Sequence, residues 1–116
     1  MLLDCSNDWQ VSVSAEKVCV YDCQTNSVRR EFHEFASVVF AQISGNNILI
    51  GQPDSIVVVF PNRDSQRTIY SVADSKILSG KVTKMDESIL VIGLSNSTVE
   101  VIEVKTGQVI KRLGEP

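Results

Sequence analysis

The stretch TVEVIEVKTGQVIKRL, residues 98–113, is the best guide to the fold of this chain. It reads as a strand of alternating apolar residues, a turn at 105–107 and a second strand. The same pattern recurs as KVCVYDCQTNSVRREF at 17–32 and as SIVVVFPNRDSQRTIY at 55–70. Three copies of one hairpin at a spacing of about 40 residues indicate a repeat protein.

The composition is that of one ordinary globular domain, and we expect a single domain spanning residues 1–116. Hydrophobic residues make up 43% of the chain and charged residues 22%, which argues against disorder. The net charge of −3 and the lack of a basic stripe argue against a nucleic-acid partner. No signal peptide and no apolar run of about 20 residues is found, so no membrane partner is expected.

Turn residues divide the chain into short strands, spaced as in all-β proteins. The pattern predicts three units of four antiparallel strands, with approximate boundaries 1–35, 36–76 and 77–116. The second unit should open with a strand at 38–43 and the third with one at 82–85. Asn26 takes the place of Gly107 in the corresponding turn, since both residue types tolerate positive φ.

Three strands are apolar without alternation, at 48–50, 56–60 and 89–92. A sheet with one wet face should alternate, so a continuous apolar run indicates burial on both faces. In an antiparallel protein this occurs when small sheets stack face to face. We therefore expect the three units to stack on one another.

The repeats resemble those of the WD-repeat β-propeller family, over essentially the whole chain. Tyr21–Asp22 and Ile102–Glu103 stand where that family has its Trp-Asp pair at the end of a third strand. Thr106–Gly107 and Thr25–Asn26 resemble the turn that follows. The chain has no Trp-Asp dipeptide and no Gly-His pair, so the family's Asp-His-Ser-Trp tetrad cannot be assembled.

This resemblance implies an all-β fold of three four-stranded antiparallel blades in an incomplete ring. Known propellers close with about four to eight blades. Three blades leave two outer blade faces uncovered, and repeat units need stacked neighbours to bury their faces. We expect a longer chain, a second copy or a partner protein to complete the ring.

The resemblance implies a non-catalytic scaffold that presents loops to a partner protein or peptide. In propellers the connections after the second and fourth strands of each blade share one face. The connection after Tyr70, at 72–81, should be longer than the one after Phe32, at 33–37. The expected partner-binding residues on these connections are His33, Glu34, Phe35, Gln52, Asp54, Asp74, Lys76 and Asn96.

Several side chains have two interpretations. Phe35 is either an apolar anchor for a partner or a side chain packed under its own loop. Gly51 and Gly93, late in second strands, indicate close packing or a bulge. The basic pairs 29–30 and 111–112 fall on outermost fourth strands, where solvated charge is expected.

Two other functions are alternatives to the scaffold. A small antiparallel β-barrel could bind an apolar ligand, although its strands should alternate. A hydrolase would have to use His33, the single histidine, but the chain has no G-x-S-x-G nucleophile motif.

The cysteine content predicts neither a disulfide framework nor a metal site. Cys5, Cys19 and Cys23 are an odd number without framework spacing. Together with His33 they are a poor match to a structural zinc site. Free thiols are typical of a reducing compartment, so we expect no metal, no cofactor, and a location in the cytoplasm or nucleus.

Overall fold

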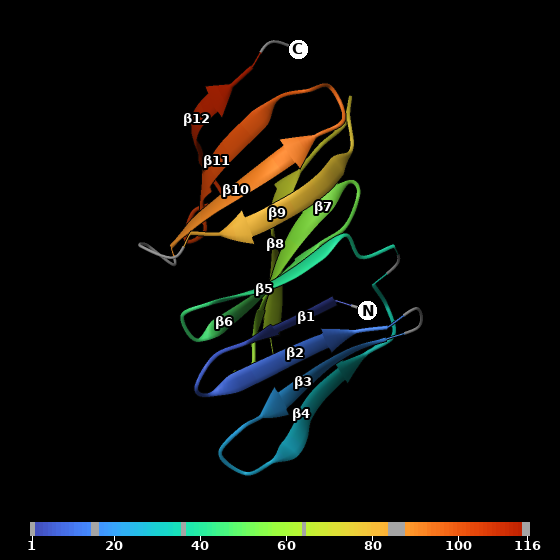
Figure 1. Ribbon diagram of the computed structural model, residues 1–116, viewed down its shortest axis with the longest axis vertical. Helices are drawn as coiled ribbons and strands as arrows, with labels where there is room; N and C mark the ends of the chain where they lie inside the picture. The colour runs from blue at the N-terminus through green and yellow to red at the C-terminus, as the bar shows by residue number, and fades with distance from the viewer. Residues whose placement is uncertain (1, 15–16, 36, 64, 84–87, 115–116) are drawn as a thin grey trace.

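The computed structural model describes residues 2–14, 17–35, 37–63, 65–83 and 88–114, and Figure 1 shows them as twelve strands in three separate sheets. Each sheet is a four-stranded antiparallel meander with its strands in sequence order. We call the sheets blades 1, 2 and 3. Blade 1 contains β1 (Leu2–Cys5), β2 (Trp9–Val13), β3 (Val18–Asp22) and β4 (Ser27–Phe32). Blade 2 contains β5 (Phe40–Ser44), β6 (Asn47–Gly51), β7 (Ser55–Phe60) and β8 (Ser65–Ser71). Blade 3 contains β9 (Ile77–Val82), β10 (Ile89–Leu94), β11 (Val99–Glu103) and β12 (Val109–Leu113).

The blades stack face to face along the long axis of the molecule, which measures 46 Å (Figure 1). One apolar core lies between blades 1 and 2, where Val11 and Val20 face Ile48 and Ile50. A second apolar core lies between blades 2 and 3, where Leu49 and other buried residues of blade 2 pack against buried residues of blade 3. The predicted stacking of three four-stranded units is confirmed.

Blade 2 is the middle layer, and its strands are buried on both faces. Successive residues of β6 and β7 are buried, as the continuous runs at 48–50 and 56–60 predicted. The third run, at 89–92, is different. Along β10, buried Leu90 and Ile92 alternate with half-buried neighbours, because no described element covers the outer face of blade 3.

The repeat is visible in the backbone as well as in the sequence. The pairing of third and fourth strands shifts register in every blade, at Val20/Tyr21, Ile56/Val57 and Val101/Ile102. Asn26 in blade 1 and Gly107 in blade 3 occupy equivalent turns between the third and fourth strands, with φ values of 56° and 75°. The predicted equivalence of these two residues is confirmed.

Side-chain acceptors link the first strands of adjacent blades. Asp4 on β1 accepts a hydrogen bond of 2.7 Å from the backbone N–H of Ile43 on β5. Gln42 on β5 accepts one of 3.3 Å from the N–H of Val82 on β9. The same contact is therefore made at both blade junctions.

Two expectations and one alternative from the sequence are wrong. The first strand of blade 3 is Ile77–Val82 instead of 82–85, and residues 84–85 lie outside the described part of the chain. The connection at 72–76 is consequently shorter than the one at 33–39. The alternative fold, a closed β-barrel, is also wrong, because the described strands form three separate sheets.

Candidate functional site

The connections β4–β5, β6–β7, β8–β9 and β10–β11 all lie on one side of the molecule, at the right of Figure 1. The antiparallel meander causes this, because alternate connections in a meander fall at the same end of the strands. We call the part formed by residues 52–54, 72–76 and 95–98 the loop surface. It spans the junction between blades 2 and 3.

Backbone hydrogen bonds join the segments of the loop surface to one another. The N–H of Val72 donates to the carbonyl oxygen of Asp54 at 2.9 Å, which links the β8–β9 and β6–β7 connections. Lys76 and Ser95 bond reciprocally, with the N–H of Ser95 donating to the carbonyl of Lys76 at 2.8 Å and the N–H of Lys76 donating to Ser95 Oγ at 2.9 Å. The three connections are thus held in one fixed arrangement.

Five of the predicted partner-binding residues lie on this surface, and four of them are exposed. Asp54, Asp74, Lys76 and Asn96 are exposed and come from three connections that are far apart in the sequence. Asp74 and Asn96 also line a hollow of about 230 Å³. Half-buried Gln52 lies beside them and accepts a hydrogen bond of 3.3 Å from the hydroxyl of Ser55.

The other three predicted residues lie at the junction of blades 1 and 2. His33 is exposed, and its Nε2 lies 2.9 Å from Glu31 Oε1. Glu34 accepts a hydrogen bond of 3.4 Å from Gln66 on β8.

Phe35 packs on the core between blades 1 and 2. Its ring centroid lies 5.3 Å from that of Phe32, with the ring planes inclined at 56°. The structure therefore shows Phe35 as the packed anchor of its own loop, and it is not grouped with the loop surface.

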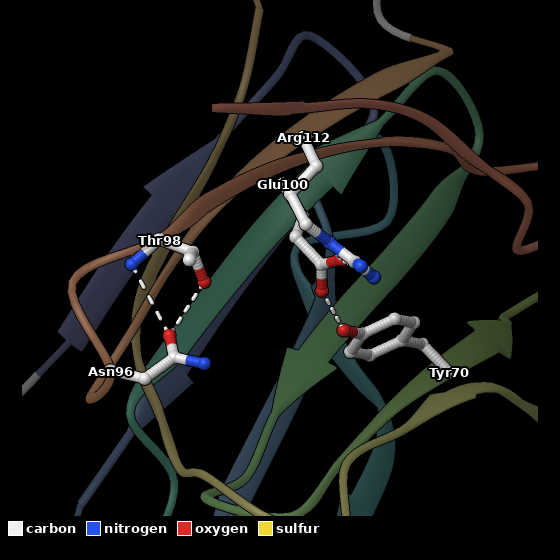
Figure 2. A network of polar contacts seen from close by, with 5 residues as sticks. All are labelled: Tyr70, Asn96, Thr98, Glu100 and Arg112. Carbon is white, nitrogen blue, oxygen red and sulfur yellow. Dashed lines mark hydrogen bonds and ion pairs between the residues drawn. The ribbon is translucent and has the colours of Figure 1, made fainter. Parts of the chain in front are cut away.

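A buried polar network lies beneath the loop surface (Figure 2). Glu100 on β11 is 1% exposed, and its Oε2 lies 2.7 Å from Arg112 Nε and 2.5 Å from Arg112 Nη2 on the neighbouring β12. The Tyr70 hydroxyl, from β8 of blade 2, donates to the other oxygen, Oε1. A buried carboxylate needs partners of this kind, because leaving it unpaired is costly. The network therefore joins blade 3 to blade 2.

The environment of Tyr70 keeps its hydroxyl protonated. Burial raises the pKa of Tyr70 above its ordinary value, and the hydrogen bond to Glu100 together with the charge of that carboxylate raises it further. The positive charge of Arg112 opposes these effects without cancelling them. The phenol is consequently kept as a hydrogen-bond donor to Glu100.

The turn above this network is shaped by a second set of bonds (Figure 2). Asn96 Oδ1 accepts from the backbone N–H of Thr98 at 3.2 Å and from the Thr98 hydroxyl at 2.6 Å. Ser97 between them has a φ of 71°. Side-chain bonds of this type are what Asn provides in turns, and here they fix the β10–β11 connection.

The predicted site residues do not include this network, although one sequence signal points to it. Glu100 stands in the apolar alternation of its strand, between Thr98 and Ile102 on the same face. Arg112 was expected to be solvated, and its side chain is indeed 62% exposed, but its guanidinium pairs with a buried carboxylate. An acid flanked by valines, with an arginine on the next strand, indicates that the two can pair, although the sequence does not show which face is buried.

Comparisons with solved structures agree with the architecture. The N-terminal domain of Nup159 superposes with a TM-score of 0.83 at 19% sequence identity, over 99% of this chain and 34% of that chain. A complex from S. cerevisiae in which Dbp5 is bound to Nup159, Gle1, IP6 and ADP matches with a TM-score of 0.82 at 18% identity, over 97% of this chain and 33% of that chain. The WD40 β-propeller domain of Doa1 matches with a TM-score of 0.73 at 17% identity, over 95% of this chain and 38% of that chain.

The fold is that of a β-propeller. No protein-family model matches the chain, and no curated protein matches it. The chain spans about a third of the length of the Nup159 domain that it resembles. In this three-bladed unit the ring is not closed, and the likeness establishes the fold alone.

Proposed function

We propose that this chain is a non-catalytic interaction scaffold of degenerate WD-like repeats, whose loop surface binds a peptide segment of a partner protein. The observation that carries the proposal is the set of hydrogen bonds joining the three connections, since rigid loops lose little entropy on binding. Four exposed polar side chains of both charges stand on this frame, and two of them, Asp74 and Asn96, line a hollow of about 230 Å³.

Two further points support a binding role over catalysis. One of the structures that share the fold contains Nup159 in complex with other proteins. His33, which a hydrolase would have to use, is exposed and pairs with Glu31. Among the described residues, no hydrogen bond joins that ring to a serine or cysteine side chain, as nucleophile activation would require.

The proposal is tested by selecting peptides from a random display library on the purified chain and measuring their affinity. We expect the selected peptides to bind the triple variant Asp54→Asn, Asp74→Asn, Lys76→Gln at least about tenfold more weakly, because paired polar groups at an interface are each worth about 1 kcal/mol. The matched control is Thr106→Ala with Gln108→Ala, at the opposite end of blade 3. Peptides that bind the triple variant as tightly as the unaltered chain would refute the loop surface as the binding site.

A further inference from the structure

A second candidate site lies at the other end of blades 2 and 3. The β5–β6, β7–β8 and β11–β12 turns are at the opposite ends of their strands from the connections of the loop surface. A cleft of about 620 Å³ opens there, and its lining includes Asn47, Phe60 and Gln66. The proposed function does not use this cleft.

Positive charge is concentrated in this cleft. Arg63 and Arg67 from blade 2 and Lys105 from blade 3 all line it, and its described lining contains no carboxylate. The chain as a whole has 14 acidic and 11 basic residues, so the local charge opposes the net charge of −3. Such a local concentration attracts anionic groups more strongly than the net charge suggests.

The geometry of the cleft orders its cationic side chains for binding. The guanidinium carbon of Arg63 lies 4.4 Å from the centre of the Phe60 ring, and this cation–π contact holds the cation at the cleft. Arg67 Nη2 donates to the carbonyl oxygen of Lys105 at 2.8 Å, which connects the two hairpins. No ion pair joins Arg63 or Lys105 to a carboxylate within the described residues. Both cations are therefore available to a ligand.

The shape of the site suits an extended chain. A smaller hollow of about 250 Å³ adjoins the cleft and shares Asn47, Val104 and Lys105 with it. Val58, Phe60 and Val104 give the cleft an apolar part, and Asn47 offers an amide group that can bond a peptide backbone. Mixed apolar and polar lining of this kind is typical of ligand-binding sites.

We infer that this basic cleft binds an acidic segment of a protein, with its carboxylate or phosphate groups paired to Arg63 and Lys105. A guanidinium and an ammonium are the usual partners of such groups. Asp8 and Asp22 line a hollow at the same end of the molecule, at the junction of blades 1 and 2. Their charges oppose a long polyanion that would run across this end, so a short acidic segment fits better than a nucleic acid.

The test is fluorescence anisotropy with a labelled eight-residue peptide of alternating Glu and Ser, and with the same peptide carrying phosphoserine. We expect both to bind the unaltered chain, and the double variant Arg63→Gln, Lys105→Gln to bind them about tenfold more weakly. We also expect the affinity to fall as salt is raised, because the pairs are partly exposed. Neither substitution removes the bond between Arg67 and the Lys105 carbonyl, so thermal unfolding should be unchanged.

The control is Lys111→Gln with Lys17→Gln, which removes the same charge outside both the cleft and the loop surface and should leave affinity within about twofold. The inference is overturned if the control weakens binding as much as the double variant, or if a Gln-Ser peptide binds as well as the acidic one. It is also overturned if single-stranded DNA of the same length binds more tightly than both acidic peptides.

Discussion

The pairing of Glu100 with Arg112 is expected to make a large contribution to stability for a single contact. Arg112→Met keeps a side chain of similar length but leaves the buried carboxylate of Glu100 with Tyr70 as its remaining partner. Breaking a buried pair from one side costs about 3–5 kcal/mol, and the partial exposure of Arg112 reduces this, so we expect a loss of about 2 kcal/mol. Urea unfolding would measure it.

The control for this prediction is Lys111→Met on the same strand. Lys111 is exposed and lies opposite Val101, so its replacement should change the free energy of unfolding by less than about 0.5 kcal/mol. Equal losses in the two variants would show that the Glu100–Arg112 pair contributes nothing specific.

The raised pKa of Tyr70 predicts a loss of stability at high pH. A phenol with a folded-state pKa above its value in the unfolded chain stabilises the fold below about pH 10. Above that pH the unfolded chain loses the proton first, so stability falls by up to about 1.4 kcal/mol per pH unit. We expect Tyr70→Phe, although less stable near pH 7, to lack this component between about pH 10 and 12.

Urea unfolding at several pH values, compared with a Tyr21→Phe control on the outer face of blade 1, would measure this component. If Tyr70→Phe and the control show the same slope of stability against pH, Tyr70 is not held protonated by the fold.

At the scale of the elements, an aromatic ring between two glycines holds blades 2 and 3 together. A Cβ added to Gly51, opposite Phe40 on β5, would overlap the Phe40 ring. A Cβ on Gly80 of β9 would lie 2.5 Å from Cε2 of the same ring. The ring therefore needs a glycine on its own blade and another on the next.

We expect Gly51→Ala to lower the free energy of unfolding by about 2–3 kcal/mol, since overpacking forces the ring and backbone apart. Gly93→Ala is the control, because its added Cβ would meet only the Ser79 hydroxyl at 3.2 Å, and a loss below about 1 kcal/mol is expected. Combining Gly51→Ala with Phe40→Leu should recover part of the loss. A loss for Gly51→Ala no greater than that of Gly93→Ala would contradict the role of the ring.

The elements show why some features of the fold are predictable from the sequence and others are not. The continuous apolar runs of β6 and β7 predicted double-sided burial because no other arrangement covers both faces. The predicted position of β9 was wrong because its inward residues, Ile77 and Val82, are separated by a register shift that breaks the alternation. The strand also contains Ser79 and Gly80, and both residue types are typical of turns.

The sequence predicted where the loop surface lies, but it did not predict the buried polar network beneath it. The meander rule correctly put the five predicted residues of the loop surface at one end of the strands. The inward direction of Glu100 could not be read from the sequence, because both faces of β11 carry apolar residues. Which face is buried depends on where blade 2 lies, and alternation does not specify a neighbour.

The outer face of blade 3 determines how the whole molecule can associate. Ile89, Val91, Val99 and Val101 form a half-buried apolar face that no described element covers. Lysines flank its centre, since Lys81 is paired with Val91 and Lys111 with Val101. Charged residues at such positions oppose association with another sheet.

Lys81 stands on blade 3 at the position where Asp4 and Gln42 supply the side-chain acceptors that link blades 1, 2 and 3. Gln42 immediately precedes the residue whose N–H bonds to Asp4, and Lys81 immediately precedes the residue whose N–H bonds to Gln42. Lys81 therefore holds the third equivalent position, but an ammonium group can only donate. A second copy stacked on blade 3 would find no acceptor there, whereas a partner strand with an acidic side chain would pair with it.

We therefore expect the chain to be a monomer of 12.8 kDa by light scattering across a concentration series. Lys81→Gln, which restores the acceptor, combined with Lys111→Thr should give a mass that rises with concentration. Lys76→Gln with Lys105→Gln removes the same charge elsewhere and should stay monomeric. The contrary result would be a mass near twice 12.8 kDa for the unaltered chain and the same mass for the Lys81 variant. It would mean that a second copy covers the outer face of blade 3 despite its lysines. The ring would then be completed by self-association rather than by a partner of opposite charge.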